Sequence, residues 1–230
     1  MSTQESFKAT EETWDAIAES FDRTRRKPWK ECLDFIESLS ASAVVADLGC
    51  GNGRHLVPCA KRCKKIIGVD ISCNLLRITQ EKIRKKGLVN ADLIHGNLIA
   101  LPFNDNSLDA VLYIAALHNI KRRENRINTL KEIKRVLKQD GTALISVWSR
   151  WQDKYRLFFL KQFLSHKDEF GDIEIPWRQH NLDIPRFYHL YSKKEFIGDI
   201  RLSGFIVKMI FSVKRISKIC SDNFFIIATL

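Results

Sequence analysis

Two kinds of hydrophobic periodicity follow one another along the chain. In the first forty residues, apolar side chains recur at helical spacing. Trp14, Ile17 and Phe21 share one stripe, and a second stripe repeats through PWKECLDFIESL, which begins with a proline. Both patterns predict amphipathic helices. From about residue 43 onward, short apolar runs alternate with helical segments, which is typical of strands joined by crossover helices.

Five apolar runs are predicted to be strands, at residues 43–49, 65–72, 91–96, 107–116 and 142–148. A long amphipathic helix is predicted over 123–141, closed by Gly141. Later segments predict a helix within 153–166, a loop over 171–185, a helix over 193–204 and a closing antiparallel strand pair at 205–216 and 222–230. The fold class expected is α/β: a doubly wound, mostly parallel, Rossmann-like sheet of seven strands with an N-terminal helical extension.

Length and composition fit one globular domain. The chain has 230 residues, of which 45% are hydrophobic, and no linker-like stretch divides it. We expect a single domain over 1–230, with a helical cap over 1–40 and an insertion over 150–192. No run approaches the ~20 apolar residues of a membrane span, and the first residues carry no targeting signal. We therefore expect a soluble, cytoplasmic protein.

Cysteine spacing and charge narrow the possible ligands. The six cysteines include no CxxC pair, so we expect reduced, mostly buried thiols and no metal site. Lys and Arg outnumber Asp and Glu by 38 to 27, a net charge of +11. Such an excess favours a polyanion such as nucleic acid through counterion release, whereas any single basic cluster is also explained as a solvated helix face.

A glycine-rich turn after the first strand predicts a cofactor site. Gly49, Gly51 and Gly53 follow Asp47 in ADLGCGNG. A carboxylate at this position would repel the pyrophosphate of a dinucleotide, and the spacing is GxGxG rather than GxGxxG. S-adenosylmethionine, with a cationic end and no phosphate, suits the motif better.

The next two strand ends carry further candidates for cofactor contacts. Asp70, with Ile71 after it, ends the second strand, where a carboxylate can accept both ribose hydroxyls. Asn97 and Leu98 follow the third strand, and the Asn97 amide can contact the adenine edge. Ligands of open α/β sheets bind at the carboxyl ends of the strands, so these positions are expected to meet there.

These motifs resemble those of a known family. VADLGCGNG, GVDIS and GNLIALPF are similar to successive motifs of the class I S-adenosylmethionine-dependent methyltransferases. Three outlying stretches, ESFDRTRRKPW, IAALHNI and IPW with RFYHLYSKKEF, resemble the wobble-uridine tRNA carboxymethyl methyltransferases, which include the yeast enzyme and animal relatives. The resemblance implies S-adenosylmethionine as cofactor, tRNA as substrate, methylation of the carboxylate of 5-carboxymethyluridine, and a small zinc-binding activator protein as partner.

The chain departs from this family's pattern in two places. His118 is followed by Asn119 where the family has two histidines, which puts a two-histidine arrangement in doubt. A short segment replaces the long charged insertion of the yeast enzyme, which implies a compact archaeal or prokaryotic version.

The reaction that the resemblance implies suggests roles for the remaining polar and aromatic residues. A carboxylate is ionised at neutral pH, so its methylation needs orientation rather than a general base. Arg186, Tyr188 and His189 are candidates to orient it, and so is Arg25, which can instead hold the methionine carboxylate of the cofactor. His118 completes the catalytic candidates. Packing roles stay open for the tyrosine and for the tryptophans Trp14, Trp29 and Trp177.

Two other functions stay open at this stage: a small-molecule methyltransferase, and an inactive RNA-binding scaffold, against which the intact acidic and glycine positions argue. A partner is expected at residues 91–96. In the usual strand order this segment is an edge strand, and it contains neither proline nor lysine to protect it, although a helix or loop of the same chain can also cover such an edge.

Overall fold

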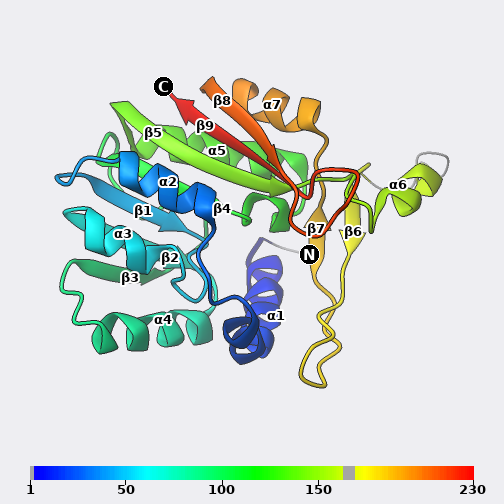
Figure 1. Ribbon diagram of the computed structural model, residues 1–230, viewed down its shortest axis with the longest axis horizontal. Coiled ribbons are helices and arrows are strands. Elements are labelled where there is room, and N and C mark those ends of the chain that lie inside the picture. The colour runs from blue at the N-terminus through cyan, green and yellow to red at the C-terminus, as the bar shows by residue number, and fades with distance from the viewer. Residues whose placement is uncertain (1–2, 163–168) are drawn as a thin grey trace.

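The computed structural model describes residues 3–162 and 169–230 (Figure 1). Its helices are α1 (Thr3–Thr24), α2 (Lys30–Ser38), α3 (Leu56–Arg62), α4 (Cys73–Lys85), the short 3-10 helix η1 (Leu117–Asn119), α5 (Arg123–Val136), α6 (Arg156–Gln162) and α7 (Lys193–Leu202). Its strands are β1 (Val44–Leu48), β2 (Lys65–Asp70), β3 (Ala91–His95), β4 (Leu108–Ile114), β5 (Leu137–Trp148), β6 (Asp172–Glu174), β7 (Phe187–His189), β8 (Ile206–Val213) and β9 (Asn223–Thr229).

Seven of these strands form one sheet in the order β3-β2-β1-β4-β5-β9-β8. Neighbours from β3 to β5 pair in parallel, and β9 runs antiparallel to both β5 and β8. The expected fold class, including the closing antiparallel pair, is therefore confirmed. The strand at 91–96 lies at one edge, as expected.

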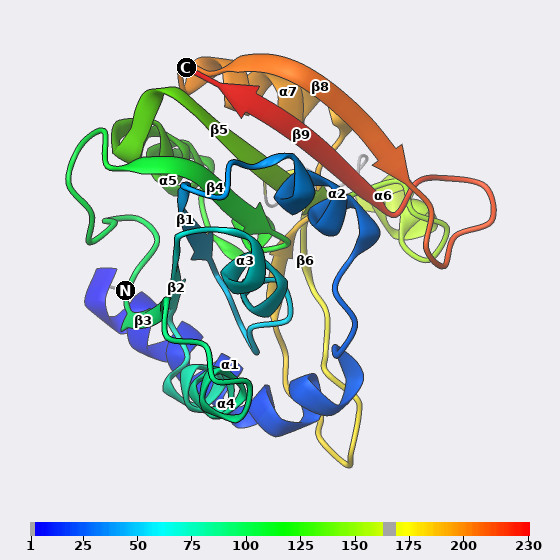
Figure 2. The ribbon, with the colours of Figure 1, turned by 60° about the vertical axis from the view of Figure 1, so that its left-hand side comes forward.

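The sheet is covered on both faces, which explains why its central strands are apolar throughout. One buried cluster joins α5 and α7 to the sheet through residues such as Leu130, Ile133 and Phe196. The other joins α2, α3 and α4 through residues such as Phe35 and Leu56. Figures 1 and 2 show the two helical layers on opposite sides of the sheet.

The boundary between α5 and β5 differs from the prediction. The helix ends at Val136, and Leu137 is already extended and paired with Leu108 on β4. Gly141 is therefore not a helix cap but lies within β5, where the pairing with β4 shifts register between Leu108 and Ala110, and an added Cβ there would approach the carbonyl oxygen of Lys138 to 2.8 Å. Burial of Leu137 in the sheet explains why the helix ends five residues before the predicted boundary at Gly141.

Two further differences concern the stretch after β5. The predicted helix at 153–166 is described only as α6, and residues 163–168 lie outside the described residues. The segment 171–185 is not a plain loop: β6 pairs with β7, and a bridge between Trp177 and Ile184 extends this hairpin. The domain boundaries, the cap over 1–40 and the insertion over 150–192, stay predictions.

Helix α1 and the β6–β7 hairpin stand where the parallel strands β1, β2 and β4 end (Figure 1). Helix α1 packs along α4, and its Ser20 hydroxyl accepts a hydrogen bond of 2.7 Å from the indole of Trp177 in the hairpin. The two elements therefore enclose space at the carboxyl ends of the sheet. Within the described residues, no helix combines the length and the apolar character needed to cross a bilayer.

Candidate cofactor and substrate site

A cavity of about 350 Å³ lies at the carboxyl ends of β1, β2, β3 and β4. Its floor is the glycine loop after β1, and its walls come from α1, η1 and the β6–β7 hairpin. Asp70 is its one acidic lining residue, against five basic residues, Arg25, Arg54, Lys121, Arg122 and Arg186. The acidic residue of the cavity thus lies at the end of β2, and its basic residues lie on other parts of the lining.

The glycine loop is held in a conformation that favours glycine. Gly49 has a φ of +70°, and a Cβ added there would lie 2.6 Å from the Cβ of Ala116. Its amide donates to the carbonyl of Val69 at 2.7 Å, which fixes the loop to β2. Gly49 and Gly51 line the cavity, whereas Gly53 is placed against Thr79 and does not. The loop backbone can thus approach a ligand closely.

Asp70 supports the loop from beneath and also faces the cavity. One carboxylate oxygen accepts the Gly51 amide at 2.7 Å, and the other accepts the Ser72 amide at 2.9 Å. Burial raises the pKa of Asp70, and these backbone hydrogen bonds oppose the rise. A carboxylate has about four acceptor sites, so Asp70 can still accept a hydrogen bond from a ligand hydroxyl.

Asp47 is buried behind the loop and is not among the residues that line the cavity. It is 1% exposed, and its Oδ2 has no hydrogen-bond partner among the described residues. Burial and, to a smaller extent, the charge of nearby Asp70 raise the pKa of Asp47 to about 7, although Arg54 opposes the rise. An uncompensated carboxyl group here favours a cation nearby.

Replacing Asp47 by asparagine is expected to raise stability of the cofactor-free protein at pH 8. Because the folded pKa lies above the unfolded value of ~4, Asp47 contributes stability that is complete below pH ~4 and is lost as the pH rises through about 7. Between pH 5 and pH 8, the free energy of unfolding of the wild type should therefore fall by roughly 1 kcal/mol or more, and that of Asp47→Asn should not show this fall. Thermal melts across this pH range test the prediction, and Asp140→Asn, at an exposed position, is the control. If the stability of the wild type and of Asp47→Asn changed in parallel with pH, the prediction would be contradicted.

The residues after β2 and β3 lie where expected. Ile71, Asn97 and Leu98 all line the cavity. The Oδ1 of Asn97 accepts the amide of Ile99 at 3.0 Å. The Nδ2 donors of Asn97 therefore remain for a ligand, as a contact with an adenine edge requires.

Arg186 lies in a cage of aromatic rings. Its guanidinium carbon is 4.7 Å from the ring centroid of Trp177, 5.8 Å from that of Trp14 and 5.0 Å from that of Tyr188. The side chain is 7% exposed, and its Nη1 donates to the Tyr188 hydroxyl at 2.5 Å. Its Nε has no partner, and no carboxylate pairs with it among the described residues.

Arg25 reaches the same place from the end of α1. Its guanidinium carbon lies 5.3 Å from the Trp177 ring, and no described carboxylate pairs with it. Burial lowers the pKa of Arg25, and the charge of Arg186 lowers it further. Two cations thus share an aromatic pocket, and no residue that the structure describes supplies a counter-ion.

Tyr188 and His118 form the adjoining wall. The Tyr188 ring stacks on Trp148 at 4.9 Å between centroids, and burial raises the pKa of its hydroxyl to about 12. The His118 Nδ1 accepts the backbone amide of Trp148 at 3.0 Å, and burial lowers the pKa of His118 to about 3. His118 is therefore neutral, with its proton on Nε2, and can only donate one hydrogen bond at that nitrogen.

His189 points away from this cavity. Neighbouring residues on β7 face opposite sides of the strand, so His189 is buried on the side opposite to Tyr188 and the cavity. Its Nδ1 lies 2.7 Å from Asp172 and its Nε2 2.8 Å from Glu195. Burial would lower the pKa of His189, but these two hydrogen bonds outweigh it and raise the pKa. Both ring nitrogens are engaged and His189 does not line the cavity, so the expectation that it orients the substrate carboxylate does not fit its position.

Residues 185–196 show no alternation of apolar and polar side chains in the sequence, and this arrangement explains why. Tyr188 and His189 are both buried because β7 has the cavity on one side and a charged network on the other. In that network Arg150 pairs with Glu195 at 2.6 Å, and Arg126 pairs with Glu169. Because polar residues are buried on both sides of β7, the sequence of this strand shows no apolar face.

Several cavity residues carry no signal in the sequence. Phe7, Thr10, Trp14 and Phe21 reach the cavity from α1, and Trp148 reaches it from the end of β5. Trp14, Phe21 and Trp177 are therefore lining residues rather than plain core. Asn119, in place of the family's second histidine, also lines the cavity, and its Nδ2 donates to the carbonyl of Ala115 at 3.1 Å.

Comparison with known proteins identifies the family to which the chain belongs. A family model described as "Methyltransferase domain" matches residues 46–145. A protein of Encephalitozoon cuniculi that carries the name of a methyltransferase is 33% identical over 196 residues, which cover 84% of this chain and 85% of that protein. The chain belongs to the S-adenosylmethionine-dependent methyltransferases. The compact length that we expected of an archaeal or prokaryotic version is thus shared by a eukaryotic relative.

Other relatives of this methyltransferase carry more specific names. The tRNA (carboxymethyluridine(34)-5-O)-methyltransferase of Xenopus tropicalis is 36% identical over 151 residues, which are 65% of this chain and 23% of that protein. The protein of that name from Schizosaccharomyces pombe is 29% identical over 213 residues, covering 84% of this chain and 86% of its own. The chain therefore spans about a quarter of the length of the Xenopus relative.

Solved structures confirm the fold of the methyltransferase. A SAM-dependent methyltransferase from Methanosarcina mazei superposes with a TM-score of 0.74 at 21% identity, covering 88% of this chain and 97% of that one. A chain from the complex between the Haloferax volcanii Trm112 methyltransferase activator and a methyltransferase gives 0.70 at 17% identity, with 96% of each chain covered.

The side chains present fit S-adenosylmethionine. When bound, this cofactor supplies an electrophilic methyl group on a sulfonium. The glycine loop permits close approach, Asp70 can accept hydrogen bonds from the ribose hydroxyls, and the Asn97 amide can donate to the adenine edge. Asp47 lies behind the loop, so its carboxyl group can favour the cationic end only through its charge and not by direct contact. These individual contacts stay predictions.

Proposed function

We propose that this methyltransferase esterifies the carboxylate of 5-carboxymethyluridine at the wobble position of tRNA. One observation carries the substrate class: the buried Arg186 and the half-buried Arg25 share an aromatic pocket beside the cofactor residues without a described counter-ion. A buried unpaired cation is costly, so the pocket is suited to an anionic group that completes it. A planar carboxylate matches a guanidinium fork.

The surrounding residues suit orientation of a carboxylate rather than proton transfer. An ionised carboxylate has no proton to lose before it attacks a methyl group, so placement and exclusion of water are what the site must provide. Arg186 supplies charge, the neutral His118 supplies one donor, and Tyr188 holds Arg186 in place. Trp14, which is half-buried, offers a ring surface on which a base can stack.

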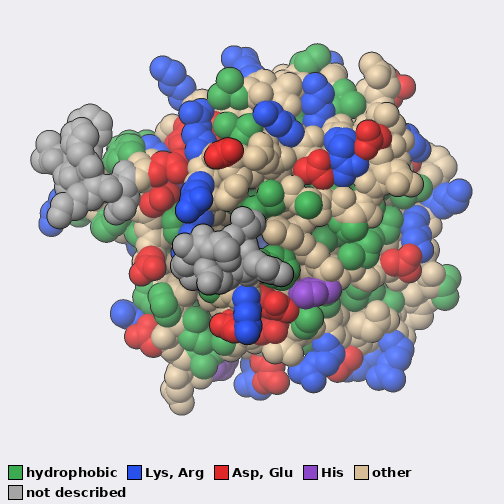
Figure 3. Space-filling model, turned by 180° about the vertical axis from the view of Figure 1, so that it is seen from behind, with side chains coloured by type: hydrophobic (Ala, Val, Ile, Leu, Met, Phe, Trp, Pro, Cys, Tyr) green, Lys and Arg blue, Asp and Glu red, His purple; other side chains and the backbone are tan. Residues whose placement is uncertain are grey.

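A basic groove beside the cavity suits the RNA backbone. It is lined by Arg23, Thr24, Arg25, Arg26, Lys27, Pro28, Trp29, Lys30, Arg54 and Arg215, with no acidic residue among them. On the face shown in Figure 3, by contrast, Lys and Arg are spread among Asp and Glu. The RTRRKPW stretch, which resembles the tRNA methyltransferases, thus forms a continuous positive lining from surface to cavity. The relatives named as tRNA methyltransferases support the same substrate.

The decisive experiment offers three acceptors to the purified protein with labelled S-adenosylmethionine. An anticodon stem-loop with 5-carboxymethyluridine at the wobble position should be methylated, and the label should be released by mild alkali, as a methyl ester requires. The same stem-loop with plain uridine should not react. Equal rates on a free small carboxylic acid would contradict the RNA substrate and favour a small-molecule enzyme; failure of every acceptor would favour an inactive scaffold.

We also propose that the chain works as a heterodimer with a small zinc-binding activator through β3. This strand pairs only with β2, and no further backbone hydrogen bond of Ala91–His95 is recorded among the described residues. Val89, just before it, is 96% exposed. A partner strand can pair with such an edge. Co-expression with a candidate activator should raise solubility and activity, and a soluble, monodisperse and fully active lone chain would contradict the proposal.

A further inference from the structure

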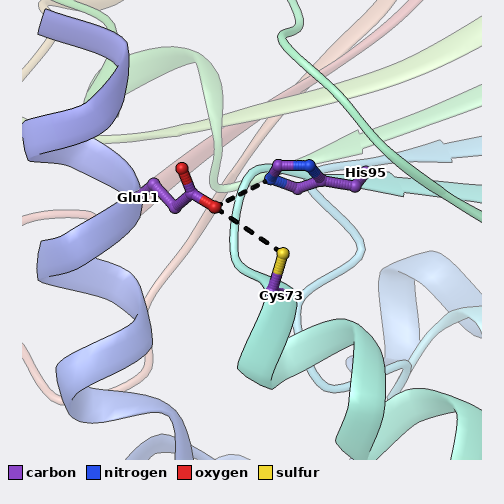
Figure 4. Close-up of side chains that lie close together, drawn as sticks. All are labelled: Glu11, Cys73 and His95. Carbon is purple, nitrogen blue, oxygen red and sulfur yellow. Dashed lines mark hydrogen bonds and ion pairs between the residues drawn. The ribbon is translucent and has the colours of Figure 1, made fainter. Parts of the chain in front are cut away.

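Three metal-ligating side chains from distant parts of the chain meet beside the cofactor cavity (Figure 4). Glu11 comes from α1, Cys73 is the first residue of α4, and His95 is the last residue of β3. The His95 Nε2 lies 3.1 Å from Glu11 Oε1, and the Cys73 Sγ lies 3.6 Å from the same oxygen. All three side chains point toward one another and are reachable from solvent.

These separations match the ligand shell of a tetrahedral zinc-type ion. With Zn–S of about 2.3 Å and Zn–N or Zn–O of about 2.0–2.1 Å, tetrahedral angles put S and O about 3.6 Å apart and N and O about 3.3 Å apart. The observed distances, 3.6 Å and 3.1 Å, need only small adjustment. The His95 Nε2 also lies 2.9 Å from the carbonyl oxygen of Ile71, so a metal ion would replace the proton shared there.

The surrounding charges leave this cluster open to a cation. No Lys or Arg pairs with Glu11 among the described residues. A second cluster, Glu169 with Asp172 and His189, is different, because Arg126 pairs with Glu169 within it. One carboxylate of that cluster is thus already paired with the Arg126 guanidinium, whereas no described Lys or Arg pairs with the Glu11 cluster.

The scaffold around the cluster is fixed by other contacts. Asp15, one turn after Glu11 on α1, accepts the Asn74 amide at 2.9 Å and the Ser72 hydroxyl at 2.5 Å. These bonds hold α1 against the first turn of α4 whether or not a metal is present. Glu11 and Cys73 are therefore preorganised for a shared ligand.

We propose that Glu11, Cys73 and His95 bind a divalent zinc-type ion, with water as the fourth ligand, and that the ion fastens α1 over the cofactor cavity. Phe7, Thr10 and Trp14 of the same helix line that cavity. Fastening α1 to the ends of β3 and α4 restricts the opening through which the cofactor leaves. Such a site would make cofactor release from the methyltransferase depend on the supply of metal ions. This proposal does not depend on tRNA being the substrate. It also departs from the expectation of no metal site, because the ligands share no sequence motif.

The test uses Co²⁺ as a spectroscopic probe on chelator-treated protein. One equivalent should bind with the near-ultraviolet charge-transfer absorption of a thiolate–cobalt bond, and Zn²⁺ should displace it. Cys73→Ser should lose this absorption, whereas Cys220→Ser, the matched control at another accessible thiol, should keep it. His95→Gln should weaken Co²⁺ binding by at least about tenfold. Absence of the band, or its survival in Cys73→Ser, would overturn the site.

The proposed role has its own readout. Zn²⁺ should slow dissociation of S-adenosylmethionine from the wild type and from Cys220→Ser, but not from Cys73→Ser. Cys73 does not line the cavity, so its removal leaves the cofactor contacts in place. Equal dissociation rates with and without Zn²⁺ in the wild type would overturn the fastening of α1.

Discussion

Replacing Arg186 by methionine is expected to lower the rate of methyl transfer at saturating RNA by about 100-fold or more. Arg186 is buried, aimed into the cavity and unpaired, so its charge is available to the reacting carboxylate. Loss of one preorganised donor of this kind costs roughly 100- to 1,000-fold in turnover. Rapid-quench measurement of ester formation under single-turnover conditions gives the chemical step directly.

The same substitution should not cost stability. An uncompensated buried cation is unfavourable, and methionine keeps much of the apolar contact with Trp177 and Trp14. The melting temperature is therefore expected to stay equal or rise while the rate falls. S-adenosylmethionine affinity should also stay close to that of the wild type.

Arg178 provides the matched control for Arg186. It lies in the same hairpin, but its side chain is exposed and its Nε pairs with Asp183 at 3.3 Å. Arg178→Met should leave the rate of ester formation unchanged. If Arg186→Met lost stability as well as activity, the residue would be holding the aromatic cage together rather than the substrate. If it kept its rate, the carboxylate would be bound elsewhere.

The cofactor half of the site was predictable because it depends on short-range features. Glycines after a buried strand and acidic or amide residues at successive strand ends fall together whenever the strands are parallel. Gly49, Asp70 and Asn97 accordingly line one cavity. Asp47 shows the limit of this reasoning, because its place in the motif does not reveal that it is buried behind the loop.

The remaining walls depend on contacts between distant segments. Nothing in the stripe of α1 distinguishes Trp14, which faces the cavity, from Ile17, which is buried. His189 and Tyr188 are neighbours in the sequence, yet the strand turns them to opposite sides. The metal cluster joins three elements with no common spacing. Such features follow from tertiary packing and cannot be derived from local patterns.

Replacing Gly49 by alanine is expected to remove detectable binding of S-adenosylmethionine. The residue has a φ of +70°, and its new Cβ would lie 2.6 Å from the Cβ of Ala116 and 3.7 Å from Leu98 Cδ1. A contact at 2.6 Å between two Cβ atoms forces the backbone of the loop or of η1 to move. Because the cofactor requires close approach to this loop, we expect its Kd to rise by at least about 100-fold, which corresponds to roughly 3 kcal/mol. Calorimetry measures this directly.

Gly87 separates the backbone strain from the steric clash. It has a similar φ of +60°, but an added Cβ there would meet nothing within 4 Å. Gly87→Ala should therefore show the strain of an alanine at positive φ, about 1–2 kcal/mol of stability, without change in cofactor affinity. Equal losses of affinity in the two variants would mean that global destabilisation, not the loop, controls binding.

A second substitution tests the clash itself. Ala116 supplies the Cβ that opposes the new methyl group, so Ala116→Gly removes the opposing atom. In the double variant, Gly49→Ala with Ala116→Gly, part of the lost affinity should return, although the positive φ remains unfavourable. Non-additivity of this sign is expected only when two side chains touch. If the double variant bound S-adenosylmethionine no better than Gly49→Ala alone, the backbone conformation of Gly49, rather than its contact with Ala116, would be the reason that a glycine is needed there.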